Sequence, residues 1–298
     1  MGIGSDAAGT AGAPEYLLQR GLTRSLAQSG FEIEVLPEIS VAEIRKEKGR
    51  EARVTEISNV ADKTRTIVSG EIRKGRKVLA LGGDHAISIG TIPGAAETVG
   101  ENLGVIWIDA HADIHTAQSS SSGNVHGMGV AAILGFGDAQ LADQRATKVK
   151  TELFLYMGLK DLDQPEIDTI RREKIAAVTM FDVLEHGFGI ITKAAEELRQ
   201  KTEKVWVSLD LDSIDESVAP ASPMATSGGL TYREVSHLLN YIGKRFEVVG
   251  MDVVELVPEK DREGKTAALA FELIAAGFGS RHNWYSEYMG QYGFPQGQ

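Results

Sequence analysis

The chain has 298 residues, of which 42% are hydrophobic and 24% are charged, fractions typical of a globular protein. Its formal net charge of −11 makes nucleic acid a poor partner, whereas a small cationic substrate is attracted by the field of such a protein. The absence of cysteine excludes disulfides, a thiolate nucleophile and thiolate metal ligands.

The start of the chain, MGIGSDAAGTAG, has no basic region and no apolar run, so we expect no signal peptide. No stretch reaches the roughly 18 apolar residues of a membrane span, so we expect no membrane partner. Together with the lack of cysteine, this favours a cytoplasmic protein.

Short apolar runs alternate along the chain with helix-like segments. The runs expected to form strands are Glu32–Leu36, Val78–Leu81, Val105–Ile108, Leu153–Tyr156, Ala176–Val178, Val205–Leu209 and Val248–Val254. The segments expected to form helices are Pro14–Gln28, Ser88–Thr98, Pro165–Arg172, Thr192–Lys201, Tyr232–Lys244 and Thr266–Ala275. Because strands covered on both faces are apolar throughout, the alternation predicts an α/β fold with a mostly parallel sheet.

No linker rich in Pro, Ser or Gly divides the chain, and no internal period of 20–50 residues appears. We therefore expect a single catalytic domain over residues 1–298. Residues 280–298 are rich in aromatic residues, and we assign them to a C-terminal extension or an oligomer contact.

Most of the expected strands run directly into carboxylate or histidine residues. The clusters are Asp84 and His85, the stretch 109–113 (DAHAD), Asp161 and Asp163, Asp210 and Asp212, and Glu255. Ligands of parallel α/β proteins bind at the carboxyl ends of the strands. These clusters should therefore converge on one edge of the sheet.

The type and spacing of these side chains indicate a metal centre. In DAHAD and in DLD, acidic or imidazole residues alternate with apolar ones, which puts them on one side of an extended chain. Carboxylates this close repel one another, and a divalent cation relieves that repulsion. A single motif of this kind is usually a solvated turn, but several at strand ends together predict ligands. The six expected metal ligands are His85, Asp109, His111, Asp113, Asp210 and Asp212.

Six ligands with several carboxylates exceed the needs of one ion, so we expect two ions about 3.5 Å apart that share a bridging Asp. Carboxylate oxygens with some imidazole suit Mn²⁺, although Co²⁺, Ni²⁺ and Fe²⁺ also accept such ligands.

The motifs as a set resemble those of the arginase/agmatinase family of ureohydrolases. They are GGDHAISIG (82–90), DAHADIH (109–115), SGNVHG (122–127), SLDLDSID (208–215), GGLTYRE (228–234) and VVELVP (253–258). The resemblance implies an arginase-like three-layer αβα sandwich, two Mn²⁺ per subunit and a homotrimer or homohexamer. It implies that Asp109 and Asp210 bridge the ions, the first of which also binds His85 and Asp113, and the second His111 and Asp212.

The resemblance also assigns substrate contacts, with L-arginine as the expected substrate. It implies that Ser122 and Asn124 contact the substrate carboxylate, and that Asp163 and Glu166 face its α-amino group. Glu255 would pair with the guanidinium. Two cations would lower the pKa of a water molecule, Asp113 would orient that water, and His126 would pass a proton to the leaving amine.

Two residues depart from the family pattern. His115 stands near the substrate carboxylate, where arginases often have Asn, and Met224 stands where a hydroxyl is usual. Other hydrolases of guanidino compounds, such as agmatinase, therefore remain alternatives that a substrate panel would separate. A deacetylase-like hydrolase would bind one ion rather than two, and an inactive regulatory relative would have lost ligands.

Overall fold

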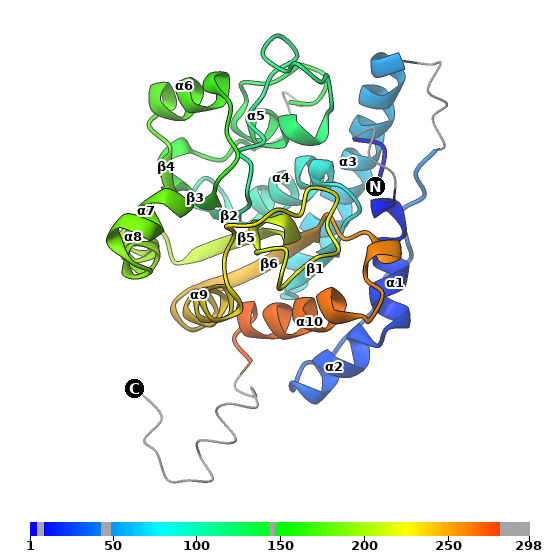
Figure 1. Ribbon diagram of the computed structural model, residues 1–298. Helices are drawn as coiled ribbons and strands as arrows, with labels where there is room; N and C mark the ends of the chain where they lie inside the picture. The colour runs from blue at the N-terminus through cyan, green and yellow to red at the C-terminus, as the bar shows by residue number, and fades with distance from the viewer. Residues whose placement is uncertain (5–8, 43–48, 143–146, 281–298) are drawn as a thin grey trace.

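The computed structural model describes residues 1–4, 9–42, 49–142 and 147–280 (Figure 1). The strands of its sheet are β1 (Val78–Leu81), β2 (Gly104–Ile108), β3 (Phe154–Leu159), β4 (Ala176–Thr179), β5 (Lys204–Asp210) and β6 (Glu247–Val254). They lie in the order β1-β6-β5-β2-β3-β4, and every pairing among them is parallel. The predicted parallel α/β sheet is confirmed.

The α-helices of the described ranges lie on both sides of this sheet (Figure 1). They are α1 (Ala13–Gln19), α2 (Leu22–Gln28), α3 (Gly49–Arg73), α4 (Ser88–Val99), α5 (Gly129–Leu134), α6 (Gln164–Glu173), α7 (Met180–His186), α8 (Gly189–Arg199), α9 (Tyr232–Arg245) and α10 (Lys265–Gly277). None of the helices in these ranges is both long enough and apolar enough to cross a membrane.

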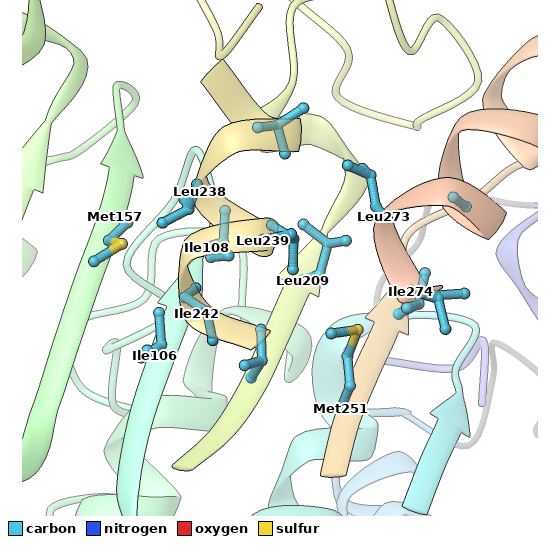
Figure 2. Packing of buried hydrophobic residues seen from close by; sticks show 14 of the residues in the cluster. Ile106, Ile108, Met157, Leu209, Leu238, Leu239, Ile242, Met251, Leu273 and Ile274 are labelled. Carbon is cyan, nitrogen blue, oxygen red and sulfur yellow. The ribbon is translucent and has the colours of Figure 1, made fainter. Parts of the chain in front are cut away.

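Side chains of alternate strand residues pack in two hydrophobic cores, one on each face of the sheet. Ile106 and Ile108 of β2 pack in the core covered by α1, α2 and α7–α10, whereas Val105 and Trp107 pack in the core covered by α3–α6. Figure 2 shows the first core, with Leu238, Leu239 and Ile242 of α9 lying over the strands. Two faces buried by two helical layers form a three-layer αβα sandwich, as predicted.

Two predicted elements differ from the observed ones. The run Glu32–Leu36 forms no strand, and its apolar side chains Ile33, Val35 and Leu36 are exposed, so its strand-like composition meets no partner strand. The segment Pro14–Gln28 forms two helices, α1 and α2, because Gly21 between them has a φ of 99°. Helices α3, α5 and α7 had not been predicted. Residues 281–298, nearly all of the expected C-terminal extension, lie outside the described residues.

The central strands position the polar clusters. Since β6, β5 and β2 are neighbours and run parallel, their carboxyl ends meet at one edge of the sheet, with that of β1 beside β6. The loops that leave this edge begin at Gly82, Asp109, Leu211 and Glu255.

Candidate metal centre

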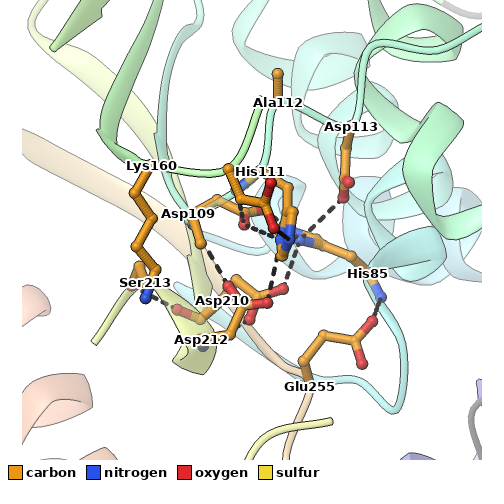
Figure 3. Close-up of polar contacts among 12 residues, drawn as sticks. His85, Asp109, His111, Ala112, Asp113, Lys160, Asp210, Asp212, Ser213 and Glu255 are labelled. Atoms are coloured by element: carbon orange, nitrogen blue, oxygen red, sulfur yellow. Dashed lines mark hydrogen bonds and ion pairs between the residues drawn. The ribbon is translucent and has the colours of Figure 1, made fainter. Parts of the chain in front are cut away.

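The six predicted ligands converge at the carboxyl edge of the sheet (Figure 3). Asp109 follows β2 directly, with His111 and Asp113 in the same extended loop. Asp210 ends β5, and Asp212 lies in the single helical turn Leu211–Ser213 that follows it. His85 begins a similar turn, His85–Ile87, after β1. Side chains separated by more than a hundred residues thus meet in one place.

The distances define two adjacent ligand groups. His85 Nδ1 lies 3.0 Å from Asp109 Oδ2, 3.2 Å from Asp210 Oδ2 and 3.4 Å from Asp113 Oδ2. His111 Nδ1 lies 3.2 Å from Asp212 Oδ2 and 3.5 Å from Asp109 Oδ1. Asp109 belongs to both groups, with one oxygen toward each histidine. This is the arrangement expected of a bridging carboxylate.

The hydrogen bonds of His85 test whether a cation fits the first group. Nε2 of His85 lies 2.8 Å from Ser208 Oγ, and that hydroxyl lies 3.2 Å from Asp252 Oδ2, to which it donates. Nε2 therefore carries the hydrogen that Ser208 accepts. Nδ1 is completely buried among three carboxylates and makes no hydrogen bond with the described residues. A buried imidazole nitrogen directed at carboxylates, with its other nitrogen held, fits a divalent cation.

Electrostatics point the same way. Burial raises the pKa of Asp210 well above its usual range, and the charges of Asp212 and Asp109 add to this effect. Burial and the charge of Asp109 also raise the pKa of Asp113, to about 8. Burial lowers the pKa of His85, but its contacts with Asp109 and Asp210 outweigh burial and raise that pKa. The cluster thus retains protons that a cation would displace, so metal binding and proton release are coupled.

A row of polar side chains inside the sheet supports the ligands. The register of β2, β5 and β6 pairs Trp107 with Ser208 and Ser208 with Asp252, and all three residues are buried. The Trp107 ring stacks on His85 at 3.9 Å between centroids, and its Nε1 donates to Asp109 Oδ2 at 2.9 Å. These residues were not predicted, although a polar residue inside an apolar strand was a visible signal.

We expect Trp107→Phe to weaken metal binding about tenfold. Removing a residue that hydrogen-bonds a metal ligand typically costs about 10–100-fold in affinity, and tenfold is the lower end of that range. The change removes the hydrogen bond to Asp109 while keeping an aromatic ring beside His85. Titration of metal-free protein with Mn²⁺ measures the change. Trp206→Phe is a matched control, because Trp206 Nε1 donates to Asp252, which reaches the ligand His85 only through Ser208. Equal losses in the two variants would contradict the assigned role.

Glu255 and His126 face each other beside the cluster. Glu255 Oε1 accepts a hydrogen bond from the His85 backbone N–H at 3.0 Å and lies 3.3 Å from His126 Nδ1. Burial lowers the pKa of His126, but the contact with Glu255 and the charge of Asp113 outweigh it and raise the pKa to about 9. The backbone N–H of His126 donates to Gly4 O, which fixes the position of this loop. His126 is therefore held as a proton donor next to a carboxylate.

The backbone is strained at two of the predicted site residues. Asp113 and Glu255, with φ values of 49° and 59°, are two of three non-glycine residues with positive φ in the described ranges. Asp113 O accepts from Val130 N, and Glu255 N donates to Gly83 O, so both peptides are held by neighbouring segments. Such strain is retained where a side chain must point into a site.

The predicted contacts for the far end of the substrate lie in the loop after β2, at the N-terminus of α6 and in the loop after β5. His115 Nε2 lies 3.1 Å from Asp163 Oδ2 and 3.9 Å from Glu166 Oε1, so these three residues come together. Ser122 Oγ accepts from the Asn124 backbone N–H at 3.2 Å, and no described contact joins either of them to the metal ligands. Met224 is 49% exposed on the loop after β5.

The group of His115, Asp163 and Glu166 also brings its ligand atoms within 4.8 Å of one another. Asp163 caps the N-terminus of α6 in a capping box with Glu166, which uses one oxygen of each carboxylate, Oδ1 of Asp163 and Oε2 of Glu166. The other oxygens, Oδ2 of Asp163 and Oε1 of Glu166, are the ones that face His115. The imidazole is the positive or donor partner of this group.

An αβα sandwich with a buried imidazole and carboxylate cluster for two cations at the carboxyl edge of its parallel sheet defines a metal-dependent hydrolase. The model of the arginase family matches residues 1–279, and the chain belongs to that family. It is 36% identical to an arginase of Bacillus caldovelox, over 94% of this chain and 96% of the relative. An arginase of Brevibacillus brevis is 35% identical over the same shares.

A solved structure of an arginase from Bacillus cereus superimposes with a TM-score of 0.85 at 32% identity, covering 92% of this chain and 94% of that one. Similarity in sequence and in fold thus extends over nearly the whole chain. The predicted family and the predicted ureohydrolase class are confirmed.

Proposed function

We propose that the protein hydrolyses L-arginine to L-ornithine and urea with two Mn²⁺ per subunit. The observation that carries this function is the convergence of the six predicted ligands into two groups that share Asp109. The assigned ligands are His85, Asp109, Asp113 and Asp210 for one ion, and Asp109, His111, Asp210 and Asp212 for the other. Their oxygen-rich chemistry with imidazole suits Mn²⁺. When bound, the ions lower the pKa of a water molecule and so supply the nucleophile.

Asp113 and Glu255 have different roles in the proposed reaction. Asp113 accepts a hydrogen bond from the attacking water and orients it. Glu255, held by the His85 N–H, pairs with the planar guanidinium of the substrate. The attacking water gives up one proton to solvent as it becomes the nucleophile, and its oxygen forms a bond to the guanidinium carbon. The bond from that carbon to the substrate's chain nitrogen then breaks, and the second proton of the oxygen passes to Asp113 as the carbonyl of urea forms.

His126 completes the reaction by giving its proton to the departing nitrogen, so that ornithine leaves as an amine and urea remains. This role is supported by the 3.3 Å distance between His126 Nδ1 and Oε1 of Glu255, the residue assigned to the guanidinium. The other end of the amino acid lies between the loop after β2 and the start of α6. His115, Ser122 and Asn124 are on that loop, and Asp163 and Glu166 are at the N-terminus of α6.

A substrate panel tests this function. Protein reconstituted with Mn²⁺ is given arginine, agmatine and guanidino acids, and urea and the product amine are measured. Arginine should give the highest kcat/KM, with ornithine equal to urea. Protein that holds two ions per subunit and releases no urea from arginine would exclude the function, and a content of one ion would favour a deacetylase-like hydrolase.

The same proposal includes the cytoplasmic location and the homotrimeric or homohexameric assembly that the family resemblance implies. Sedimentation of the Mn²⁺-loaded protein measures the assembly directly. A monomer that is fully active would exclude it.

A further inference from the structure

His115 lies where the loop after β2 meets the start of α6, the two segments that we propose receive the far end of the substrate. It comes from the loop after β2, and its Nε2 contacts Asp163 Oδ2 at 3.1 Å, at the start of α6. Its Nδ1 lies 3.1 Å from Ser119 Oγ in its own loop. The His115 side chain is 15% exposed, so it is largely buried on its own side of the contact.

The hydrogen bonds around Ser119 set the direction of the contact with Asp163. Ser119 Oγ accepts the backbone N–H of Thr116 at 2.9 Å, which leaves its own hydrogen free to donate to His115 Nδ1. The hydrogen of the neutral ring is then on Nε2, which lies 3.1 Å from Asp163 Oδ2. A charged ring also carries a hydrogen on Nε2, so both forms of His115 present an N–H on the side of Asp163.

By the family resemblance, Asp163 would face the ammonium group of the substrate. Its side chain is 46% exposed at the carboxyl edge of the sheet, near Asp161 and Glu166, whereas the facing loop offers the hydroxyls of Ser120 and Ser122. Charge complementarity directs the ammonium of an amino acid to the acidic side and its carboxylate to the hydroxyl side. One oxygen of Asp163, Oδ2, already has a donor within the protein, Nε2 of His115.

We propose that His115 determines specificity by serving as the donor to Asp163 when a substrate has no α-amino group. This inference rests on the proposed arginine-hydrolysing function. The protein therefore accepts guanidino carboxylic acids that lack the α-amine as substrates in addition to arginine.

The physical reason is whether Asp163 keeps a hydrogen-bond donor once a substrate covers it. A site that depends on the substrate for a hydrogen bond rejects an analogue without that group by about 10⁴–10⁵-fold, because a polar group is left unpaired. Here Asp163 keeps the N–H of His115 whichever substrate is bound. We therefore expect kcat/KM for 5-guanidinopentanoate, which is arginine without its α-amine, to fall by no more than roughly a hundredfold.

A matched pair of variants tests the role. In His115→Gln the side-chain nitrogen lies close to the place of Nε2 and still reaches Asp163, whereas in His115→Asn it corresponds to Nδ1 and is too short to do so. Each variant is loaded with Mn²⁺, and kcat/KM is measured for arginine and for 5-guanidinopentanoate. His186→Asn, which changes an exposed histidine on α7, serves as the control.

We expect His115→Asn to increase the preference for arginine over 5-guanidinopentanoate by roughly tenfold, the size of one unpaired polar group. His115→Gln and His186→Asn should keep the wild-type preference. The role of His115 is overturned if both His115 variants keep that preference, or if both substrates lose activity equally in His115→Asn. Wild-type protein that releases no urea from arginine would instead refute the proposed function, so the two failures are distinguishable.

Discussion

Replacing Asp210 with Asn is expected to abolish metal binding and nearly all urea release. Asp210 lies within the first ligand group and is assigned to both ions, so the amide removes the charge that balances them. Loss of even an outer partner of a ligand costs about 10–100-fold, so losing a ligand should cost more than about a hundredfold in urea release. Metal content and urea formation, measured on the same preparation, check the result.

The stability of the same variant gives a second, independent readout. In the metal-free protein, burial and the charges of Asp212 and Asp109 raise the pKa of Asp210 well above its usual range. Asn keeps the shape of Asp and adds no charge to the repulsion among these buried carboxylates, so the metal-free Tm should be almost unchanged. The wild-type Tm should rise when Mn²⁺ is added, because a ligand that binds only the folded state stabilises it, whereas the variant's Tm should not.

Asp168→Asn is the control for both measurements, since Asp168 is an exposed residue of α6 bonded only to Gln164 among its described partners. It should keep two ions, wild-type urea release and the rise in Tm. An Asp210→Asn protein that held both ions and released urea at the wild-type rate would show that the ligands are wrongly assigned.

The sheet and the ligands were predictable because one physical constraint governs both. Strands buried on two faces must be apolar, so a run such as Val105–Ile108 is visible, and the first polar residue after it marks its carboxyl end. In a parallel sheet those ends lie together. Asp109, Asp210 and Glu255 could therefore be placed at one edge without knowledge of the strand order.

Other features depend on partners that the sequence does not reveal. The run Glu32–Leu36 has the composition of a strand, yet whether it pairs is decided by neighbours elsewhere in the chain. Helix α3 buries a narrow stripe of apolar residues among polar ones, Val54, Ile57, Val60 and Val68. Such a stripe is a weak helix signal in the sequence, because its burial depends on packing against α4.

The support behind His85 was hidden for a similar reason. Asp252 is visible as a carboxylate inside an apolar run, but its contact with Ser208 follows from the register of β5 against β6. The contact of His115 with Asp163 likewise requires the relative position of the loop after β2 and the start of α6. Sequence indicated which residues carry chemistry, and the register and loop geometry determine which of them act together.

Replacing His126 with Asn is expected to leave both ions bound and to slow turnover by at least about a hundredfold, the contribution of general acid catalysis. His126 is assigned to no ion, and it lies 3.3 Å from Glu255, which we propose pairs with the substrate guanidinium. Asn can keep a hydrogen bond to Glu255, but it cannot release a proton. The loss should therefore appear in kcat more than in KM, with metal content unchanged.

The pH profile separates this role from a structural one. The pKa of His126 is raised to about 9, because its contact with Glu255 and the charge of Asp113 outweigh its burial. A group with a raised pKa carries its proton below that pKa and loses it above. The wild-type kcat should therefore fall at alkaline pH, where His126 has lost the proton that it donates. The variant has no such proton to lose, so this alkaline decline should be absent from its kcat profile. His186→Asn, an exposed substitution, should keep both the rate and the decline. Wild-type turnover in His126→Asn with a full complement of ions would remove His126 from the mechanism and leave solvent as the proton donor.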